Sequence, residues 1–309
     1  MENKHIPVLL NEVIEGLNIK PDGVYLDLTL GRAGHSSEIL SRLNSKGLLI
    51  GVDQDQQAIA ESKERLDKFE GNFVLVKDNF ANVDEILRSL NIVKVDGVLM
   101  DLGVSSPQFD DIDRGFSYRF DSRLDMRMDQ DQKLTAHDVV NTYSESELRK
   151  IFYEYGEDKY SASVARNIVK ERENHPIDTT FQLVDIIKKS KPAKELKKAG
   201  HPAKQIFQAI RIEVNDELNV LKKALNDVTK HLNSGGRLAV ITFHSLEDKI
   251  VKKLFKDLTV VEGNRNNLPI KEEEKDFILI TRKGIKPSEA ELEINHRSQS
   301  STLRIIEKK

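Results

Sequence analysis

Two aspartates follow short apolar runs of the chain, and their positions suggest ligand chemistry. Asp53 comes directly after LLIGV, and Asp101 ends the run VDGVLMD. A glycine turn with the sequence GRAG, Gly31–Gly34, lies about twenty residues before Asp53. An acid at that distance beyond a glycine turn is placed to accept hydrogen bonds from ribose hydroxyls. The spacing therefore predicts a site for a cofactor that contains a ribose.

The turn argues against a dinucleotide as that cofactor. It reads G-x-x-G and not G-x-G-x-x-G, and Ala33 stands where a glycine would let the backbone approach a pyrophosphate. A cofactor with a ribose and an adenine but no phosphate fits better, and S-adenosylmethionine is such a molecule. Its amino-acid end would meet the turn, and its ribose would meet Asp53. The alternative is that Gly31 and Gly34 only shape a tight turn.

Two more segments follow strand-like runs and should reach the same crevice, where ligands of open α/β sheets bind. Phe80, after the run FVLV, is placed to pack on an adenine ring, although a lone aromatic side chain is by default part of the core. Asp101 begins the segment DLGVSSPQ, at an edge that would border both cofactor and substrate. A buried aspartate is costly unless it is paired, so a helix cap or an ion pair is the alternative to a ligand role.

The chain has no cysteine, and this narrows the chemistry. Disulfides, thiolate metal sites, iron–sulfur clusters and reactions through a protein thiolate are excluded, and we expect no metal. A methyl transfer would then be a direct displacement onto a nitrogen or oxygen, because methylation at C5 of a pyrimidine needs a thiolate adduct. An exocyclic base amine needs hydrogen-bond acceptors and alignment with the methyl carbon. Asp101, Ser106 and Pro107 are the predicted catalytic residues, with Phe109 as a substrate contact.

The elements that must position these residues alternate between strands and helices over the first hundred residues. Short apolar runs bounded by turn residues predict buried strands, and amphipathic stretches predict the helices between them. Continuous apolar strands joined by helices indicate a parallel sheet that is covered on both faces. The predicted strands are 24–29, 48–52, 73–76 and 95–101, and the predicted helices are 36–43, 58–69 and 83–90.

This alternation stops for about a hundred residues, where we predict helices and no strand. Capping boxes, S-x-x-E at Ser144 and T-x-x-Q at Thr179, mark two helix starts. Apolar residues spaced three and four apart from Leu218 to Leu232 predict a long helix that ends at Gly235.

We expect an α/β fold with an inserted helical domain. Further strands at 237–243, 277–281 and 303–306, with a helix at 246–258, complete a mostly parallel, seven-stranded sheet. The predicted segments are a first part of the α/β domain at 1–106, a helical insertion for substrate recognition at 107–203, and a second part of the α/β domain at 204–309.

The composition of the chain excludes several other classes of protein. The chain has 309 residues and a net charge of −3, so it is not a globally basic nucleic-acid coat, though a local basic face is allowed. No apolar run reaches the roughly 18 residues needed to cross a bilayer. The first seventeen residues carry Glu2, Glu12 and Glu15, which is unlike a signal peptide. We expect a cytoplasmic protein without a membrane partner.

A nucleic-acid contact must therefore be local, and one stretch is suited to it. Residues 188–204 hold seven lysines and a single acid, Glu195. Lys194, Lys197 and Lys198 are the predicted phosphate contacts, and the alternative is a solvated helix end. Arg114 is a further predicted substrate contact, in a region rich in aspartates where structural ion pairing is favoured for most arginines. His244 is predicted to face the crevice and touch the target base, with a role at a helix start as the alternative.

Several unusual strings, in order from end to end, resemble the bacterial small-subunit ribosomal RNA cytosine-N4 methyltransferases, the MraW (RsmH) family. The resemblance rests on DLGVSSPQ at Asp101, on LDMRMD at Leu124 and on FHSLED at Phe243. It extends to further segments at 5–10, 31–36, 113–116, 207–212, 215–218, 295–297 and 303–304.

The resemblance implies a class I methyltransferase fold with an inserted helical domain. It implies S-adenosylmethionine-dependent methylation of the N4 amine of a cytosine in the decoding region of 16S ribosomal RNA. The partner would be that RNA or the small ribosomal subunit, with no DNA, and the protein would be a monomer or homodimer. The cofactor contacts that the resemblance implies are Ala33, Gly34, His35, Asp53, Phe80, Asp101 and Gln108.

Two other functions remain open at this point. One is a dinucleotide-dependent oxidoreductase, against which the turn spacing argues. The other is a non-enzymatic RNA-binding assembly factor that retains a vestigial cofactor fold. Calorimetry with S-adenosylmethionine and with NAD distinguishes an oxidoreductase from a methyltransferase. Transfer of a labelled methyl group distinguishes a methyltransferase from a non-enzymatic assembly factor.

Overall fold

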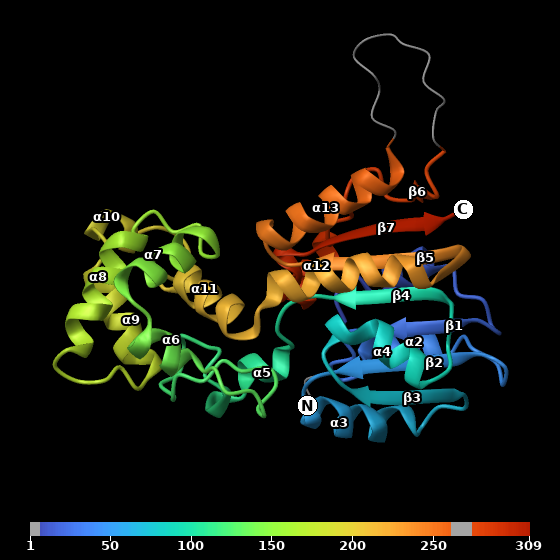
Figure 1. Ribbon diagram of the computed structural model, residues 1–309, viewed down its shortest axis with the longest axis horizontal. Coiled ribbons are helices and arrows are strands. Elements are labelled where there is room, and N and C mark those ends of the chain that lie inside the picture. The colour runs from blue at the N-terminus through green and yellow to red at the C-terminus, as the bar shows by residue number, and fades with distance from the viewer. Residues whose placement is uncertain (1–6, 261–273) are drawn as a thin grey trace, which may run out of the picture. The chain divides into compact units, whose positions relative to one another are not determined.

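The computed structural model describes residues 7–260 and 274–309 (Figure 1). It divides into two compact units. Met1–Gly103 and Asn219–Lys309 form the first, which we name the sheet unit, and Val104–Leu218 forms the second, the helical unit. His5 and Ile6, the first residues of one segment that carries the family resemblance, lie outside the described residues.

The described part of the sheet unit contains a seven-stranded sheet in the order β3-β2-β1-β4-β5-β7-β6. Strands β1 to β5 pair in parallel, whereas β7 runs antiparallel to both β5 and β6. This is the mostly parallel α/β sheet that the sequence predicted. The bounds are β1 Val24–Asp27, β2 Leu48–Asp53, β3 Asn72–Lys77, β4 Val95–Asp101, β5 Leu232–Thr242, β6 Phe277–Leu279 and β7 Thr302–Lys308.

Helices cover both faces of this sheet, because its strands are apolar on both sides. Successive residues of one strand enter different cores: Tyr25 packs with one cluster and Leu26 with the other. Buried side chains of α1 (Leu10–Leu17), α2 (Gly34–Leu40) and α3 (Gln56–Leu66) belong to the first cluster. Those of α4 (Val83–Ser89), α12 (Glu217–Val228) and α13 (Ser245–Thr259) belong to the second.

The helical unit has its own apolar core and, among its residues, no strand beyond one isolated bridge between Arg123 and Thr179. The capping boxes at Ser144 and Thr179 are confirmed. No helix in the described parts of the chain is long and apolar enough to span a bilayer. The helices are α5 Ser106–Asp110, α6 Ala136–Thr142, α7 Glu145–Glu154, α8 Ser161–Arg172, α9 Thr180–Lys189, α10 Ala193–Leu196 and α11 Lys204–Asn215.

Two differences from the sequence-based expectation have clear causes. The helix predicted over Leu218–Leu232 ends at Val228, and Leu232 is instead the first residue of β5. Leu232 and Val228 are both buried in the same core, so helix spacing alone could not separate them. The helical unit also continues to Leu218 where we expected a boundary after Ala203, because α11 buries its apolar face, including Phe207 and Ile210, in the core of that unit.

Candidate functional site

Three aspartates stand at the carboxyl ends of three neighbouring strands in the sheet unit. Asp27 ends β1, Asp53 ends β2 and Asp101 ends β4, and β1 lies between the other two strands. Parallel strands place these ends on one edge of the sheet, which is where open α/β sheets bind ligands. The structure thus brings together Asp53 and Asp101, and it adds Asp27, which the sequence analysis did not select.

Asp53 holds the glycine turn. Its Oδ2 atom accepts the N–H of Gly31 at 2.8 Å, and its Oδ1 atom accepts the N–H of Asp55 at 2.9 Å. Gly31 has φ +51 and Ala33 has φ +54, so the chain before α2 passes twice through left-handed conformations. Desolvation raises the pKa of Asp53 to about 6, against the lowering effect of these two hydrogen bonds. Each carboxylate oxygen keeps further acceptor capacity, which is what a ribose diol requires.

Asp27 is buried and tied to the start of α2. The Ser36 hydroxyl donates to its Oδ2 atom at 2.7 Å, and the Thr29 N–H donates to its Oδ1 atom at 3.1 Å. Burial raises the pKa of Asp27 to about 6 in spite of these donors. Thr29 also reaches the third strand end, because its hydroxyl accepts the N–H of Asp101 at 2.6 Å. The strand ends are thereby joined by side chains as well as by the sheet.

Asp101 is the least satisfied of the three carboxylates. Its side chain is 25% exposed, and its Oδ1 atom is buried with no hydrogen-bond partner among the described residues. Desolvation, and then the charges of Asp27 and Glu247, raise the pKa of Asp101 well above its ordinary range. A cluster of desolvated carboxylates with an unmet acceptor favours a cationic or hydrogen-bond-donating ligand.

His35 lies beside Asp101. Its Nδ1 atom is 3.7 Å from Asp101 Oδ2, and its Nε2 atom is 2.9 Å from the carbonyl oxygen of Val8. The imidazole is buried, so the chain before α1 and the end of β4 meet at this ring. His35 follows Gly34, where a Cβ would lie 2.5 Å from Cγ of Pro7. Glycine is therefore required at this position for the N-terminal segment to pack over the turn.

His244 and Glu247 form a pair at the end of β5. His244 is the N-cap of α13, and its Nδ1 atom accepts the N–H of Glu247 at 3.5 Å. Glu247 is buried, and its Oε2 atom accepts the N–H of Phe243 at 2.7 Å. This capping box is the structural alternative named for His244. The Nε2 atom of His244 lies 3.1 Å from Glu247 Oε1 and has no hydrogen-bond partner among the described residues. Within this part of the chain, one ring nitrogen is therefore left for another partner.

Phe80 begins a 3-10 helix, η1 (Phe80–Asn82), directly after β3. Its ring packs partly buried against the core between the sheet and α4, α12 and α13. Asn79 caps this turn through the N–H of Ala81 and also donates to the Gln54 side chain at 3.0 Å. Phe80 is thus both a core residue and part of the same sheet edge as Asp53.

The predicted base-binding segment belongs to the helical unit. Ser105 is the N-cap of α5, and the Gln108 side chain accepts the Ser105 N–H at 3.1 Å, which gives Gln108 a capping role. Ser106 and Pro107 form the first turn of this helix. Phe109 packs against the helical core and meets Phe116 edge to face at 6.3 Å. The structure therefore presents a short capped helix where the sequence suggested a loop.

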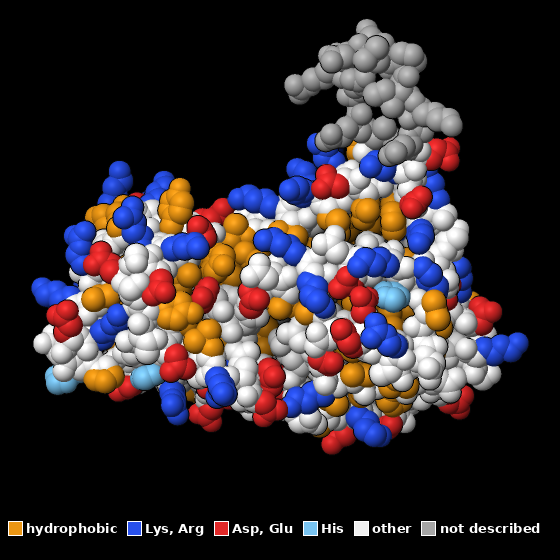
Figure 2. Space-filling view, in the orientation of Figure 1, with side chains coloured by type: hydrophobic (Ala, Val, Ile, Leu, Met, Phe, Trp, Pro, Cys, Tyr) orange, Lys and Arg blue, Asp and Glu red, His pale blue; other side chains and the backbone are white. Residues whose placement is uncertain are grey.

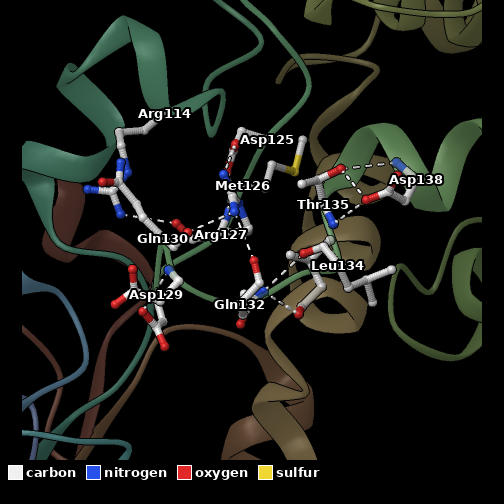
Figure 3. Close-up of polar contacts among 12 residues, drawn as sticks. Arg114, Asp125, Met126, Arg127, Asp129, Gln130, Gln132, Leu134, Thr135 and Asp138 are labelled. Carbon is white, nitrogen blue, oxygen red and sulfur yellow. Dashed lines mark hydrogen bonds and ion pairs between the residues drawn. The ribbon is translucent and has the colours of Figure 1, made fainter.

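Arg114 holds two segments of the helical unit together (Figure 3). It is only 4% exposed, and its Nη2 atom donates to the carbonyl oxygens of Arg127 and Met128, each at 3.0 Å. Arg127 in turn donates to both oxygens of the Asp125 carboxylate, from Nε to Oδ1 at 2.9 Å and from Nη2 to Oδ2 at 2.8 Å. These contacts favour a structural role for Arg114 over the substrate contact that we predicted.

The lysine-rich stretch is anchored at one end and exposed elsewhere. The side chain of Lys191 is 6% exposed, pairs with the buried Asp158 at 2.5 Å and donates to the Pro202 carbonyl at 2.7 Å. Lys194 and Lys197 are exposed, and Lys198 is paired with Glu195 at 2.7 Å. On the face of the molecule in Figure 2, basic and acidic side chains are interspersed, in keeping with the low net charge.

Residues 2–309 match the MraW methylase family. The chain belongs to this family. It is 54% identical to a Clostridioides difficile (strain 630) protein named Ribosomal RNA small subunit methyltransferase H, over 100% of both chains. A protein of the same name from Mycoplasma mycoides subsp. mycoides is also 54% identical, over 99% of both. A solved rRNA methylase from Streptococcus thermophilus has a TM-score of 0.43 and 12% identity, and covers 97% of this chain and 93% of its own.

The strand order and the parallel pairing confirm the α/β fold class that we expected, and membership of the MraW methylase family makes this the sheet of a methylase. Within it, Asp27, Thr29 and Ser36 are the residues that sequence reasoning missed. The signal for Asp27 was present, because it ends the apolar run VYL in the same way that Asp53 ends LLIGV. The strand predicted over 24–29 is two residues longer than β1, so the acid at its end lay inside the predicted strand.

Proposed function

We propose that this protein transfers a methyl group from S-adenosylmethionine to the N4 amine of a cytosine in the small-subunit ribosomal RNA, in its decoding region. The observation that carries the proposal is the set of three desolvated carboxylates at one sheet edge, with the buried Oδ1 atom of Asp101 unpartnered among the described residues. The MraW-family relatives named above, with methylation of small-subunit rRNA in their names, support the choice of substrate.

The residues at this edge fit the cofactor. Asp53 would accept hydrogen bonds from the ribose hydroxyls, while its bond to the Gly31 N–H keeps the turn beside it. Asp101 and Asp27 would offset the positive charge of the cofactor, and Phe80 would pack on the adenine ring. Ala33, Gly34 and His35 would shape the end that receives the amino-acid part. When bound, S-adenosylmethionine supplies a methyl group on a sulfonium, from which a neutral thioether would leave as the bond between sulfur and the methyl carbon breaks.

The chain's own residues would act mainly by positioning the target amine. With no cysteine, the enzyme has no route through a thiolate adduct, so the amine attacks the methyl carbon directly. Asp101 is placed to accept a hydrogen bond, and Ser106 and Pro107 follow it within six residues along the chain. We include Phe109 and His244 as contacts of the base, and Lys194, Lys197 and Lys198 as contacts of phosphates.

Nucleoside mass spectrometry of treated RNA tests this function. Purified small subunits and free 16S RNA are each incubated with the protein and methyl-labelled S-adenosylmethionine, alongside the Asp101→Asn variant. The expected product is N4-methylcytidine with the wild-type protein and much less with the variant. Label on C5 or on a ribose would overturn the proposed chemistry. RNA binding without label transfer would favour an assembly factor, and calorimetric binding of NAD but not of S-adenosylmethionine would favour an oxidoreductase.

A further inference from the structure

Exposed or partly exposed aromatic and basic side chains gather on one surface of the helical unit. We name this the aromatic–basic surface and define it by Tyr118, Arg119, Phe120, Phe181, Lys188 and His201. The segment 118–120 and the start of α9 are joined by backbone contacts. The Thr180 hydroxyl donates to the carbonyl oxygen of Phe120 at 2.7 Å, and the Thr180 N–H donates to the carbonyl oxygen of Ser122 at 2.8 Å.

Two phenylalanines are displayed from these joined segments. Phe120 is 45% exposed and Phe181 is 44% exposed, which is high for rings of this size. Their backbones are fixed, since the Phe181 N–H donates to the Asp121 carboxylate at 3.2 Å and Phe120 accepts from Thr180. Exposed rings on a fixed backbone lose little conformational entropy when a flat partner stacks on them.

A third flat group is the stack of His201 on Tyr118. The two rings are nearly parallel, at 7°, with centroids 4.3 Å apart, and Tyr118 rests edge to face on Phe207 at 5.6 Å. His201 Nδ1 accepts the Ala203 N–H at 3.2 Å. Burial, and then the charges of Lys188, Arg119 and Lys191, lower the pKa of His201. The imidazole is therefore neutral at pH 7 and serves as a stacking ring, with cations around it.

The charges that act on His201 also indicate where the nearby cations lie. Arg119 and Lys188 both act electrostatically on His201, so they lie near the Tyr118–His201 stack, and both are exposed. Two acids share these elements. Asp121 is engaged by the Phe181 N–H, and Asp185 lies on the exposed face of α9. Aromatic faces interleaved with cations match a chain of bases and phosphates, whereas the exposed charges of Arg119 and Lys188 suit an apolar protein partner poorly.

We propose that the aromatic–basic surface binds a single-stranded segment of the substrate RNA, with bases stacked on Phe120, Phe181 and His201, and phosphates contacted by Arg119 and Lys188. The inference rests on the proposed function and deepens it, because it names a subsite on the helical unit for the RNA. Stacking is tolerant of sequence, since every base has a flat face. The subsite would therefore select unpaired RNA and not a particular sequence.

Binding of a fluorescently labelled, unstructured oligoribonucleotide of about a dozen uridines tests the proposal on the full chain. The double variant Phe120→Leu, Phe181→Leu keeps apolar area but removes the stacking faces. We expect its affinity to fall by about 30-fold or more, because two stacked bases are lost and each is worth roughly 1–3 kcal/mol. The salt dependence of binding should stay as in the wild type, because no cation is removed.

A second variant and a control separate stacking from charge. Arg119→Gln with Lys188→Gln should instead flatten the log–log salt dependence, by about 0.7 for each phosphate that is no longer neutralised. Tyr153→Ala removes another exposed ring of the helical unit, 69% exposed on α7, and should leave binding unchanged. Equal binding by the leucine variant and the wild type would overturn the proposal, and so would equal affinity for an RNA duplex.

Failure of this inference can be told apart from failure of the proposed function. If the wild-type protein methylates small-subunit RNA and the leucine variant does so at the same rate and affinity, the subsite is wrong and the function stands. If the leucine variant loses binding to the oligoribonucleotide while the wild-type protein transfers no methyl group, the surface binds RNA and the enzymatic proposal fails. A protein that pulls down with the wild type but not with the leucine variant would identify the surface as a protein-docking site and overturn the RNA subsite.

Discussion

The backbone N–H of Gly31 donates to Oδ2 of Asp53 at 2.8 Å, so the end of β2 fixes the glycine turn that follows β1. This contact joins two parts of the site that are 22 residues apart in the sequence. Asp53 consequently has two tasks: it shapes the turn, and it offers the acceptor atoms that a ribose needs. The two tasks can be separated by substitution.

Asp53→Ala should weaken S-adenosylmethionine binding by about 1–3 kcal/mol, through loss of hydrogen bonds to a charged acceptor. The variant also leaves the Gly31 and Asp55 N–H groups without this acceptor. Asp53→Asn is the matched variant, because it keeps one acceptor oxygen but loses the charge, and its affinity should fall between those of the wild type and Asp53→Ala. Isothermal calorimetry on the folded proteins measures the difference. If Asp53→Ala binds the cofactor like the wild type, Asp53 does not belong to the site.

The pH dependence of cofactor affinity follows from the raised pKa values. Asp27 and Asp53 have pKa values of about 6, against an ordinary value of 3.8, so both are ionised above pH 6 and become protonated below it. A cationic cofactor prefers the ionised form, and therefore its affinity should be lost as the pH falls from about 7.5 to 5. Asp27→Asn should flatten part of this dependence. Calorimetric titrations across that range check it, and a flat wild-type profile would contradict it.

The strand ends of the site could be predicted from sequence because each is a local pattern. An apolar run followed by an acid marks the end of a buried strand, and this holds for Asp53 and Asp101. Contacts between separate segments have no local sequence pattern that would predict them. The Thr29 bond to Asp101 depends on the pairing of β1 with β4, and the Ser36 bond to Asp27 depends on the turn that brings α2 back to the end of β1. Periodicity reveals neither.

Arg114 is a residue whose burial could not be predicted from the sequence. Its type and position suggested RNA, since arginine is the usual phosphate ligand. Its burial favours a structural role instead, because its guanidinium donates to two backbone carbonyls inside the helical unit. The substrate contact stays a prediction. A sequence shows which residues are charged but not how deeply their side chains are buried. A buried arginine and a surface arginine therefore cannot be told apart from the sequence alone.

Arg114→Ala should therefore destabilise the protein by about 2–4 kcal/mol, since two carbonyl groups lose a charged donor. Cofactor affinity should not change, because the site residues that we assign to the cofactor's ribose and charge lie in the sheet unit. Urea unfolding measures the stability, with Arg166→Ala as the control. Arg166 is 72% exposed and its Nε atom is 3.9 Å from Glu145, so its loss should change stability by less than about 0.5 kcal/mol. A stable Arg114→Ala protein with weakened RNA binding would restore the substrate role.

Neutralising Lys194, Lys197 and Lys198 to glutamine should lower RNA affinity and flatten its salt dependence. The log–log slope should fall by about 0.7 for each phosphate of a single strand that these lysines no longer neutralise. Lys198 is paired with Glu195 and must break this ion pair to reach a phosphate. We therefore expect Lys198 to contribute least of the three lysines to RNA affinity. The matched control is the exposed triple on α13: Lys252, Lys253 and Lys256. If both triple variants keep the wild-type slope, these lysines are only solvated.

The chemistry itself is tested at α5. The target cytosine would be splayed out of its stack and held by the Ser105–Phe109 segment, so that positioning supplies most of the rate. Pro107 stiffens the first turn of a five-residue helix that the Ser105 and Gln108 capping box begins. Pro107→Gly should consequently lower the single-turnover rate of methyl transfer more than it lowers cofactor affinity, because it loosens the segment that positions the base. Ser106→Ala should have a smaller effect, unless the Ser106 hydroxyl accepts a hydrogen bond directly from the amine. Full-rate transfer by both variants, with cofactor affinity measured separately, would remove this segment from the reaction.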